Sequence, residues 1–232
     1  MDTTKYKAFA DKHFGGFSDL ELLITAFTHR SYLNEHKSTA KNHNERLEFL
    51  GDAVLELVVT QHLYNNFKEP EGVLTNWRSA LVRTESISTA ADREGFEALL
   101  RLSRGEKRGS ERARQQILAN CYEAVVGALY LDQGYDAAKD FISRTLLPTL
   151  PEILQNGSWL DPKSRLQEMV QSREGFTPIY KVMEEEGPDH EKKFVVGVYV
   201  NDEPKGQGEG PSKQAAQVTA ATQALKNYTR ED

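Results

Sequence analysis

Apolar residues recur at steps of three and four along most of residues 1–155, which is the spacing of one face of a helix. The clearest stretch begins at Asn44 and is expected to continue to about Asn66. Its apolar face is made by Leu47, Leu50, Val54, Leu57 and Val58. The other helical regions expected from this spacing are 5–36, with a break at Gly15-Gly16, then 73–93, 115–131 and 136–150, the last of which is expected to be ended by Pro148 and Pro151.

The periodicity changes beyond residues 155–161, where turn-forming residues interrupt it. Apolar and polar residues then alternate as in strands, between helices capped by Asp161 and Ser212. The expected elements are a helix from Asp161, strands at 179–183 and 194–200, a short strand after Asn201-Asp202, and a helix at 213–228. The sequence therefore predicts an all-α helical domain, residues 1–155, followed by a small α+β domain with the order α-β-β-β-α, residues 162–230.

Three acids share one face of the helix that begins near Asn44, namely Glu45, Glu48 and Asp52. At 1.5 Å rise per residue, Glu48 and Asp52 lie about 6 Å apart along the axis, where like charges repel. A divalent metal ion would neutralise such a pair. The alternative is that these are solvated acids on the polar face of an amphipathic helix, which is the commoner case in an arbitrary chain.

A second polar pair, Asn120 and Glu123, lies three residues apart in the helix expected at 115–131. If the two helices pack side by side, the four polar groups form an oxygen-rich cluster suited to a hard cation such as magnesium. A di-iron bundle would need Glu-x-x-His pairs, and neither helix has one.

Composition and charge narrow the kinds of metal site, location and partner that the sequence allows. The single cysteine, Cys121, has no His/Cys ligand cluster around it and gives no zinc motif. The chain has neither the apolar core of a signal peptide nor an 18-residue uncharged stretch, so a cytoplasmic protein with no membrane partner is expected. The net charge of −6 argues mildly against a nucleic-acid partner. The charge balance is reversed between Arg101 and Arg114, because this stretch contains six basic residues and two acids.

His29 follows an apolar run and precedes Arg30-Ser31-Tyr32. One histidine makes no metal site, so we expect a helix-end residue that forms hydrogen bonds or packs.

These residues resemble bacterial ribonuclease III, a metal-dependent endonuclease of double-stranded RNA. The segment from Asn44 to Ala53 resembles the family signature, and the segment from Ile117 to Asp132 resembles its second catalytic helix. Leu74-Thr-x-x-Arg78 and Gly105-Glu106 continue the match. The tail resembles the double-stranded-RNA-binding domain in Lys163–Glu168, Gly187–His190 and Gly210–Lys213.

The resemblance implies a magnesium-dependent phosphodiester hydrolase, with manganese as a substitute and no small-molecule cofactor. Its metal ligands would be Glu48, Asp52, Asn120 and Glu123, with Asp52 and Glu123 catalytic and Glu45 and Glu71 as accessory acids of the same cleft. One ion would activate a water for in-line attack on phosphorus, and a second about 4 Å away would stabilise the leaving 3′ oxygen. The products would have 5′-phosphate and 3′-hydroxyl ends.

The family's usual aspartate is replaced here by Asn120. An amide oxygen can coordinate a metal but brings no charge, so weaker metal affinity is expected. The rival interpretation is a double-stranded-RNA-binding protein on the same scaffold that is catalytically impaired by Asn120.

The resemblance also implies partners. The family works as a homodimer, with Phe49 at the interface and one cleft per subunit, which makes staggered cuts. Ribosomal and messenger RNA processing is the implied role. In the tail, shape-selective contacts to duplex RNA would come from Ser164, Gln167, Glu168, His190, Ser212, Lys213 and Gln214. Gln214 stands where the family often has a second lysine, so one phosphate contact is lost and binding should be weaker.

Overall fold

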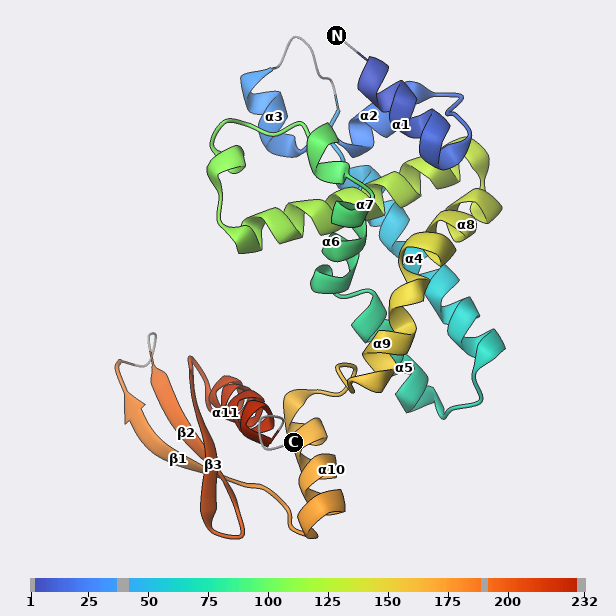
Figure 1. The fold of residues 1–232 in the computed structure, drawn as a ribbon. Helices are drawn as coiled ribbons and strands as arrows, with labels where there is room; N and C mark the ends of the chain where they lie inside the picture. Colours follow the sequence, from blue (N-terminus) through green and yellow to red (C-terminus); the bar gives the residue numbers. More distant parts are fainter. Residues whose placement is uncertain (1–2, 37–41, 189–191, 229–232) are drawn as a thin grey trace. The chain divides into compact units, whose positions relative to one another are not determined.

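The computed structural model describes residues 3–36, 42–188 and 192–228, and the chain divides into two compact units, residues 1–156 and 157–232 (Figure 1). The described part of the first unit consists of helices, and the second unit holds a three-stranded sheet with helices α10 and α11. The predicted fold class, an all-α domain followed by an α-β-β-β-α domain, is confirmed.

The first unit is built from nine described α-helices and three short 3-10 turns. In chain order they are α1 (Thr4–Phe14), α2 (Leu20–Ala26), α3 (Arg30–Glu35), α4 (Glu45–Asn66), α5 (Glu71–Leu81), α6 (Thr84–Arg93), η1 (Phe96–Leu99), η2 (Glu106–Arg108), α7 (Glu111–Gln133), α8 (Tyr135–Thr145), η3 (Leu147–Thr149) and α9 (Leu150–Gln155).

The expected helix over residues 136–150 is wrong in detail. α8 ends at Thr145, Pro148 lies in η3, and Pro151 lies in the first turn of α9. Proline lacks the N–H that a helix interior needs, but the first turn leaves that N–H unpaired in any case. Pro151 therefore helps to begin a helix where the sequence analysis expected it to end one.

Helices α4 and α7 cross in the middle of the first unit and pack against each other more extensively than any other pair of its elements (Figure 1). Two glycines permit the close approach. A Cβ atom added to Gly51 would lie 1.7 Å from the backbone oxygen of Glu123, and one added to Gly127 would lie 2.2 Å from that of Leu47. The two backbones therefore touch directly, which brings the polar residues beside these glycines into one region.

Aromatic side chains fill the core around this crossing. Phe96, Phe141 and Tyr122 pack against one another with ring centroids 5.3–6.4 Å apart, and the Tyr122 hydroxyl hydrogen-bonds Thr145 Oγ1 at 2.7 Å. Burial raises the pKa of the Tyr122 phenol well above its ordinary value. The pairing with Thr145 satisfies the hydroxyl, as a buried polar group requires.

The second unit follows the predicted order, with α10 (Pro162–Glu174), β1 (Ile179–Glu186), β2 (Lys193–Val200), β3 (Glu203–Gly210) and α11 (Lys213–Tyr228). The strands pair antiparallel in the order β1-β2-β3. Asp161 accepts hydrogen bonds from the backbone N–H groups of Lys163 and Ser164, and Ser212 Oγ accepts from Ala215, so both predicted caps are present.

Small residues allow α11 to lie directly on β3. Gly206, Gly208 and Gly210 alternate along the strand, and a Cβ atom on Gly208 would lie 2.2 Å from the backbone nitrogen of Ala220. The alanines on one face of this helix are buried, including Ala216, Ala220, Ala221 and Ala224.

Among the helices of the described residues, none has the length and apolar character needed to span a membrane.

The helix crossing can be tested by adding a single methyl group. Gly51→Ala should lower the free energy of unfolding by at least about 3 kcal/mol, because ordinary overpacking costs about 1–3 kcal/mol and here the clash is with backbone. Denaturant titration of the full chain measures the change. Gly72→Ala is the matched control, since nothing lies within 4 Å of its added Cβ in α5. A Gly51→Ala protein as stable as the control would mean that the helices do not cross this closely.

Candidate active site

A group of carboxylates lies where α4 and α7 cross. Glu48 and Asp52 are one turn apart on α4, and Glu123 lies on α7 at the point where its backbone oxygen faces Gly51. Both Asp52 and Glu48 raise the pKa of Glu123 through their charges, which places the three carboxylates in electrostatic contact. The crossing therefore assembles Glu48, Asp52 and Glu123, hereafter the carboxylate cluster.

Burial and mutual repulsion raise the pKa of two members of the cluster, Glu123 and Glu48. Burial, followed by the charges of Asp52 and Glu48, raises the pKa of Glu123 to about 8. The pKa of Glu48 is raised by burial, by Glu45 and by Asp52. Within the described residues, no lysine or arginine forms an ion pair with these three carboxylates. A cation bound here would remove this repulsion.

Asn120 belongs to the same region. Its side chain lies close enough to Glu48 to counteract part of the rise in the pKa of Glu48. Its Oδ1 atom accepts a hydrogen bond of 2.7 Å from Gln116 Nε2, one turn earlier on α7. The structure therefore brings together the four residues expected as metal ligands.

Glu45 borders the cluster at the start of α4. Its carboxylate lies 3.3 Å from Arg30 Nη1 and 3.8 Å from His43 Nδ1, and its charge acts on Glu48. It is thus adjacent to the cluster, as expected of an accessory acid.

Glu71 lies elsewhere in one chain. It begins α5, accepts a hydrogen bond of 3.3 Å from Thr75 Oγ1, and lines a cavity of about 430 Å³ with Thr60 and Tyr64. Thr60 is twelve residues beyond Glu48 on α4, which corresponds to about 18 Å along the axis. The expectation that Glu71 shares the cleft is therefore not met within one chain.

The donor set of the cluster suits a hard divalent cation, because carboxylate oxygens are the ligands that magnesium prefers. Over residues 3–36, 42–188 and 192–228, no three His, Cys, Asp or Glu side chains already surround a common point as a metal shell. The carboxylates fit such an ion by their chemistry and uncompensated charge, and their side chains would converge further on binding it.

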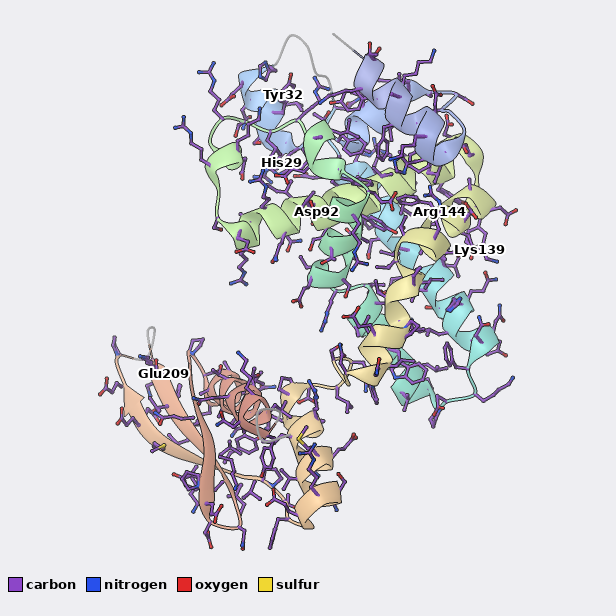
Figure 2. All side chains as sticks on the ribbon, viewed as in Figure 1. His29, Tyr32, Asp92, Lys139, Arg144 and Glu209 are labelled. Atoms are coloured by element: carbon purple, nitrogen blue, oxygen red, sulfur yellow. The ribbon has the colours of Figure 1, made fainter. Side chains whose placement is uncertain are left out.

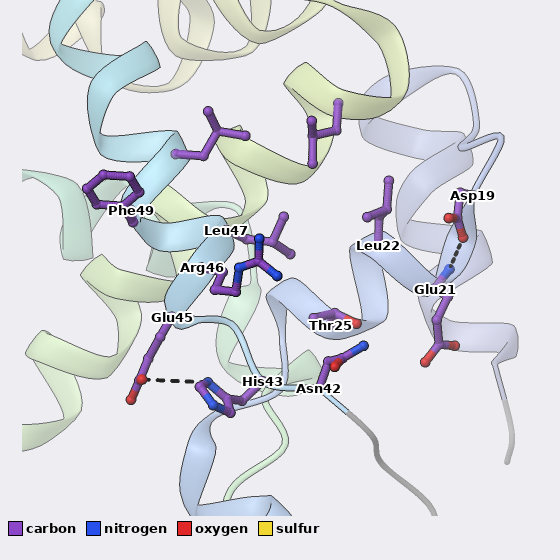
Figure 3. A pocket seen from close by; sticks show the side chains of 12 residues that line it. Asp19, Glu21, Leu22, Thr25, Asn42, His43, Glu45, Arg46, Leu47 and Phe49 are labelled. Atoms are coloured by element: carbon purple, nitrogen blue, oxygen red, sulfur yellow. Dashed lines mark hydrogen bonds and ion pairs between the residues drawn. The ribbon is translucent and has the colours of Figure 1, made fainter.

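An apolar cavity of about 870 Å³ lies beside the start of α4 (Figure 3). Leu22, Leu47 and Phe49 line it, together with Arg46 and Glu45. Phe49 is 82 % exposed, although it follows directly on a cluster residue. Leu131, at the end of α7, is also exposed and lines the same cavity, so Phe49 and Leu131 form an apolar surface on α4 and α7. Leu57, expected to face the core, is exposed as well.

The basic stretch from Arg101 to Arg114 is only partly a surface patch. Arg101 is buried, donates to Thr28 Oγ1 at 3.1 Å and lies over the ring of Tyr32. Arg114 pairs with Glu97. The exposed remainder is Arg104, Lys107, Arg108 and Arg112.

His29 has the structural role expected of it. It precedes α3, and its Nδ1 atom accepts from the backbone N–H of Ser31 (Figure 2). Its pKa is lowered mainly by burial.

In the second unit, Gln167 and Glu168 lie exposed on α10, and Ser164 donates to the Asp161 carboxylate. Lys213 and Gln214 lie exposed in the first turn of α11, behind Ser212. His190 lies outside the described residues.

Lys213 is already engaged within the unit. Its Nζ atom lies 3.6 Å from Glu185 on β1, and Lys192 Nζ lies 2.9 Å from the same carboxylate. The hydrogen bond from Lys192 is the main cause that lowers the pKa of Glu185.

Two residues of these sites, Gln116 and Glu185, were not predicted from the sequence. Gln116 precedes Asn120 by four, so the i,i+4 spacing was a usable signal. Glu185 gave none, because its contact with Lys213 depends on how the sheet packs beside α11.

Each of the two units matches a known protein family. Residues 19–150 match the family model described as "Ribonuclease-III-like", and residues 162–228 match the double-stranded RNA binding motif. Ribonuclease 3 of Enterococcus faecalis is 44 % identical over 212 residues, which cover 91 % of this chain and 92 % of that protein. Ribonuclease 3 of Oceanobacillus iheyensis is 44 % identical over 217 residues, covering 93 % and 95 %.

A solved structure is also similar. The nuclease domain of ribonuclease III from Campylobacter jejuni, described with flexibility in a region involved in dimer formation, aligns with a TM-score of 0.55 at 34 % identity. The alignment covers 65 % of this chain and 99 % of that one.

The pKa of Glu123 predicts how stability without metal depends on pH. Glu123 keeps its proton in the folded state up to about pH 8, whereas an unfolded glutamic acid releases it near its ordinary pKa of 4.5. The free energy of unfolding should therefore fall as pH rises between these values. In chelator, the melting temperature of Glu123→Gln should decline less from pH 5 to 8 than that of the wild type.

Glu111→Gln, which removes an exposed acid on the same helix, is the matched control and should keep the wild-type slope. Comparing differences in slope cancels the contributions of histidines. Equal slopes for Glu123→Gln and wild type would contradict the assignment.

Proposed function

Since this chain belongs to the ribonuclease III family and is an endoribonuclease, we propose that it hydrolyses double-stranded RNA in a magnesium-dependent reaction. The products have 5′-phosphate and 3′-hydroxyl ends, and the cuts on the two strands are staggered. The observation that carries this proposal is the cluster of Glu48, Asp52 and Glu123 at the α4–α7 crossing, which holds three carboxylates without a cationic partner in the described chain.

Glu48, Asp52 and Glu123 would hold the divalent cation, with Asp52 and Glu123 nearest the chemistry. When bound, the cation supplies positive charge that stabilises the phosphodiester as negative charge develops on its oxygens. The chain's own contribution is to fix the carboxylates on two helices whose backbones touch, so that they cannot move apart. Such rigid support is what holds a catalytic constellation in place.

The second unit binds the duplex by its shape. The exposed residues of α10, Gln167 and Glu168, are placed to reach a minor groove, and Lys213 at the start of α11 is placed to meet phosphates. Structured precursors of ribosomal and messenger RNA are the substrates we propose, and they would place the protein in the cytoplasm.

The working form is a homodimer. The support is the exposed apolar surface of Phe49 and Leu131, which line the cavity at the start of α4. A two-fold interface uses the same patch on both copies. An exposed side chain of each copy can therefore fill the neighbouring cavity of the other copy. The Campylobacter jejuni relative is described with a region involved in dimer formation.

The second candidate is a double-stranded-RNA-binding protein with impaired catalysis. Asn120 favours it, because the amide brings no charge to the cluster. Glu48, Asp52 and Glu123 favour the active enzyme, and incubation with long duplex RNA in magnesium and in chelator distinguishes the two.

Replacing Glu123 tests the active site directly. Glu123→Gln should reduce cleavage of a long RNA duplex at least about 100-fold, since losing even outer partners of a metal site costs about 10–100-fold. Duplex binding measured in chelator should remain within about twofold of wild type, because the RNA-binding unit is unchanged. Asp136→Asn, an exposed acid in the first turn of α8, is the control and should cut normally. Normal cutting by Glu123→Gln would remove Glu123 from the site.

Phe49 tests the dimer. Phe49→Asp should shift the protein from about twice its chain mass to the chain mass of 26.2 kDa in sedimentation equilibrium. A buried charge on an apolar interface is costly unless it is paired. Ile179→Asp, at another exposed apolar residue, in the second unit, is the control and should leave the mass unchanged. A Phe49→Asp protein with the wild-type mass would move the interface elsewhere.

A further inference from the structure

Strand β3 is an edge of the sheet, because among the described strands it pairs with β2 alone (Figure 1). Along an edge strand, every second residue directs its N–H and C=O groups away from the neighbouring strand. In β3 these residues are Lys205, Gln207 and Glu209, since the backbone groups of Lys205 and Gln207 bond to α11 and not to β2. Such a row of outward backbone groups is a template for pairing with another strand.

Two amide side chains of α11 occupy this edge. Gln223 Oε1 accepts a hydrogen bond of 2.7 Å from the backbone N–H of Gln207, and Asn227 Nδ2 donates one of 2.9 Å to the backbone oxygen of Lys205. Gln223 and Asn227 are four residues apart, so they lie on one face of the helix. A side-chain amide offers the same N–H donor and C=O acceptor as a peptide group. The two side chains therefore take the positions that the backbone of an added strand would take.

The other edge of the sheet is protected differently. The pairing of β1 with β2 is interrupted between Val182 and Glu184, and the strand ends in three consecutive acids. Bulges and charges of this kind discourage strand addition. The pairing of β3 with β2 is regular from Gly206 to Gly210, so this part of β3 lacks such an irregularity.

The charges along the β3 edge are self-complementary. If two β3 strands pair antiparallel about Gln207, Lys205 of one copy lies opposite Glu209 of the other, and the two-fold axis repeats the pair. Opposite charges directly across two strands attract, whereas a parallel pair in register would set Lys205 against Lys205. A cavity of about 610 Å³ lies beside Gln207 and Glu209, where Thr219 and Thr222 of α11 form its other wall.

We propose that the edge of β3 is a self-association surface, which pairs antiparallel with the β3 edge of a second copy of this chain, and that Gln223 and Asn227 keep it occupied. The contact is autoinhibitory, because two amides held in the same chain compete at high effective concentration for the groups that the second copy needs. The surface belongs to the second unit, so the inference does not rest on the proposed function or on Phe49.

Removing both amides tests the proposal. Gln223→Ala combined with Asn227→Ala should give a weight-average mass at least about twice that of wild type at the same high concentration, because each exposed edge accepts another copy. Sedimentation equilibrium of the full chain measures this. Both side chains are exposed, so their truncation leaves the core of the unit intact. A double variant with the wild-type mass at every concentration would overturn the proposal.

Thr222→Ala is the matched control. Thr222 lines the same cavity, but its hydroxyl donates to the backbone oxygen of Val218 at 2.8 Å, within α11. This variant should keep the wild-type mass. An equal increase in mass for Thr222→Ala would show that the two amides are not what keeps the edge occupied.

Charge reversal tests the antiparallel register. Lys205→Glu, added to the double variant, should return the mass to that of wild type, because it sets an acid against Glu209 twice in each pair. Adding Glu209→Lys as well restores opposite charges and should restore the association. Association that is unchanged by Lys205→Glu would overturn the register.

Amide hydrogen exchange locates the association. In wild type the Gln207 N–H should exchange slowly, because Gln223 accepts its hydrogen bond. In the double variant it should exchange fast at low concentration, and the amides of Gln207 and Glu209 should both become protected as the mass rises. A rise in mass without this protection would place the contact elsewhere and overturn the proposal.

Discussion

Direct contact between the backbones of α4 and α7 is the constraint on which the rest of the helical unit depends. Gly51 faces a carbonyl oxygen of α7, and Gly127 faces one of α4, so neither helix can shift without a clash or a gap. Ridges of ordinary side chains would keep helix axes 8–10 Å apart. Removing them at two positions lets acids on both helices lie in the same region, and the same contact leaves Glu48 and Glu123 partly buried. Their raised pKa values are thus a consequence of the packing that assembles them.

Local signals in the sequence were sufficient for most of the architecture. Asp161 and Ser212 cap their helices as expected, because capping depends on residues within three positions. The turn at Asn201-Asp202 has both residues at positive φ, 49° and 63°, which asparagine and aspartate tolerate well. The strand pattern at 194–200 succeeded because β2 is central and buried. The prediction for Pro151 failed because a proline can end one helix or begin the next. The residue type does not distinguish the two cases, and only the surrounding packing decides between them.

The candidate site was predictable only as far as helical spacing reaches. Spacing of three and four placed Glu48 with Asp52 and Asn120 with Glu123, but the crossing that joins the pairs depends on Gly51 and Gly127, whose importance appears only in three dimensions. Glu71 required knowledge of where α5 folds back on α4. Leu57 was misleading for a different reason: an apolar residue on a helix indicates burial, yet a surface that binds another chain has the same composition. Arg101 shows the reverse, a charged residue that is buried.

Glu185 forms ion pairs with two lysines of the second unit, and these pairs compete with the binding of a nucleic acid. Lysines that neutralise the phosphates of a nucleic acid release the cations condensed on it, and this release favours binding. Lys213 and Lys192 already pair with an anion that is covalently part of the chain, and it cannot diffuse away when a phosphate takes its place. The displaced carboxylate stays nearby, next to Glu184 and Glu186 on the same strand, as a tethered competitor. The two lysines therefore contribute less to binding than their number suggests, because each must give up its pair with Glu185.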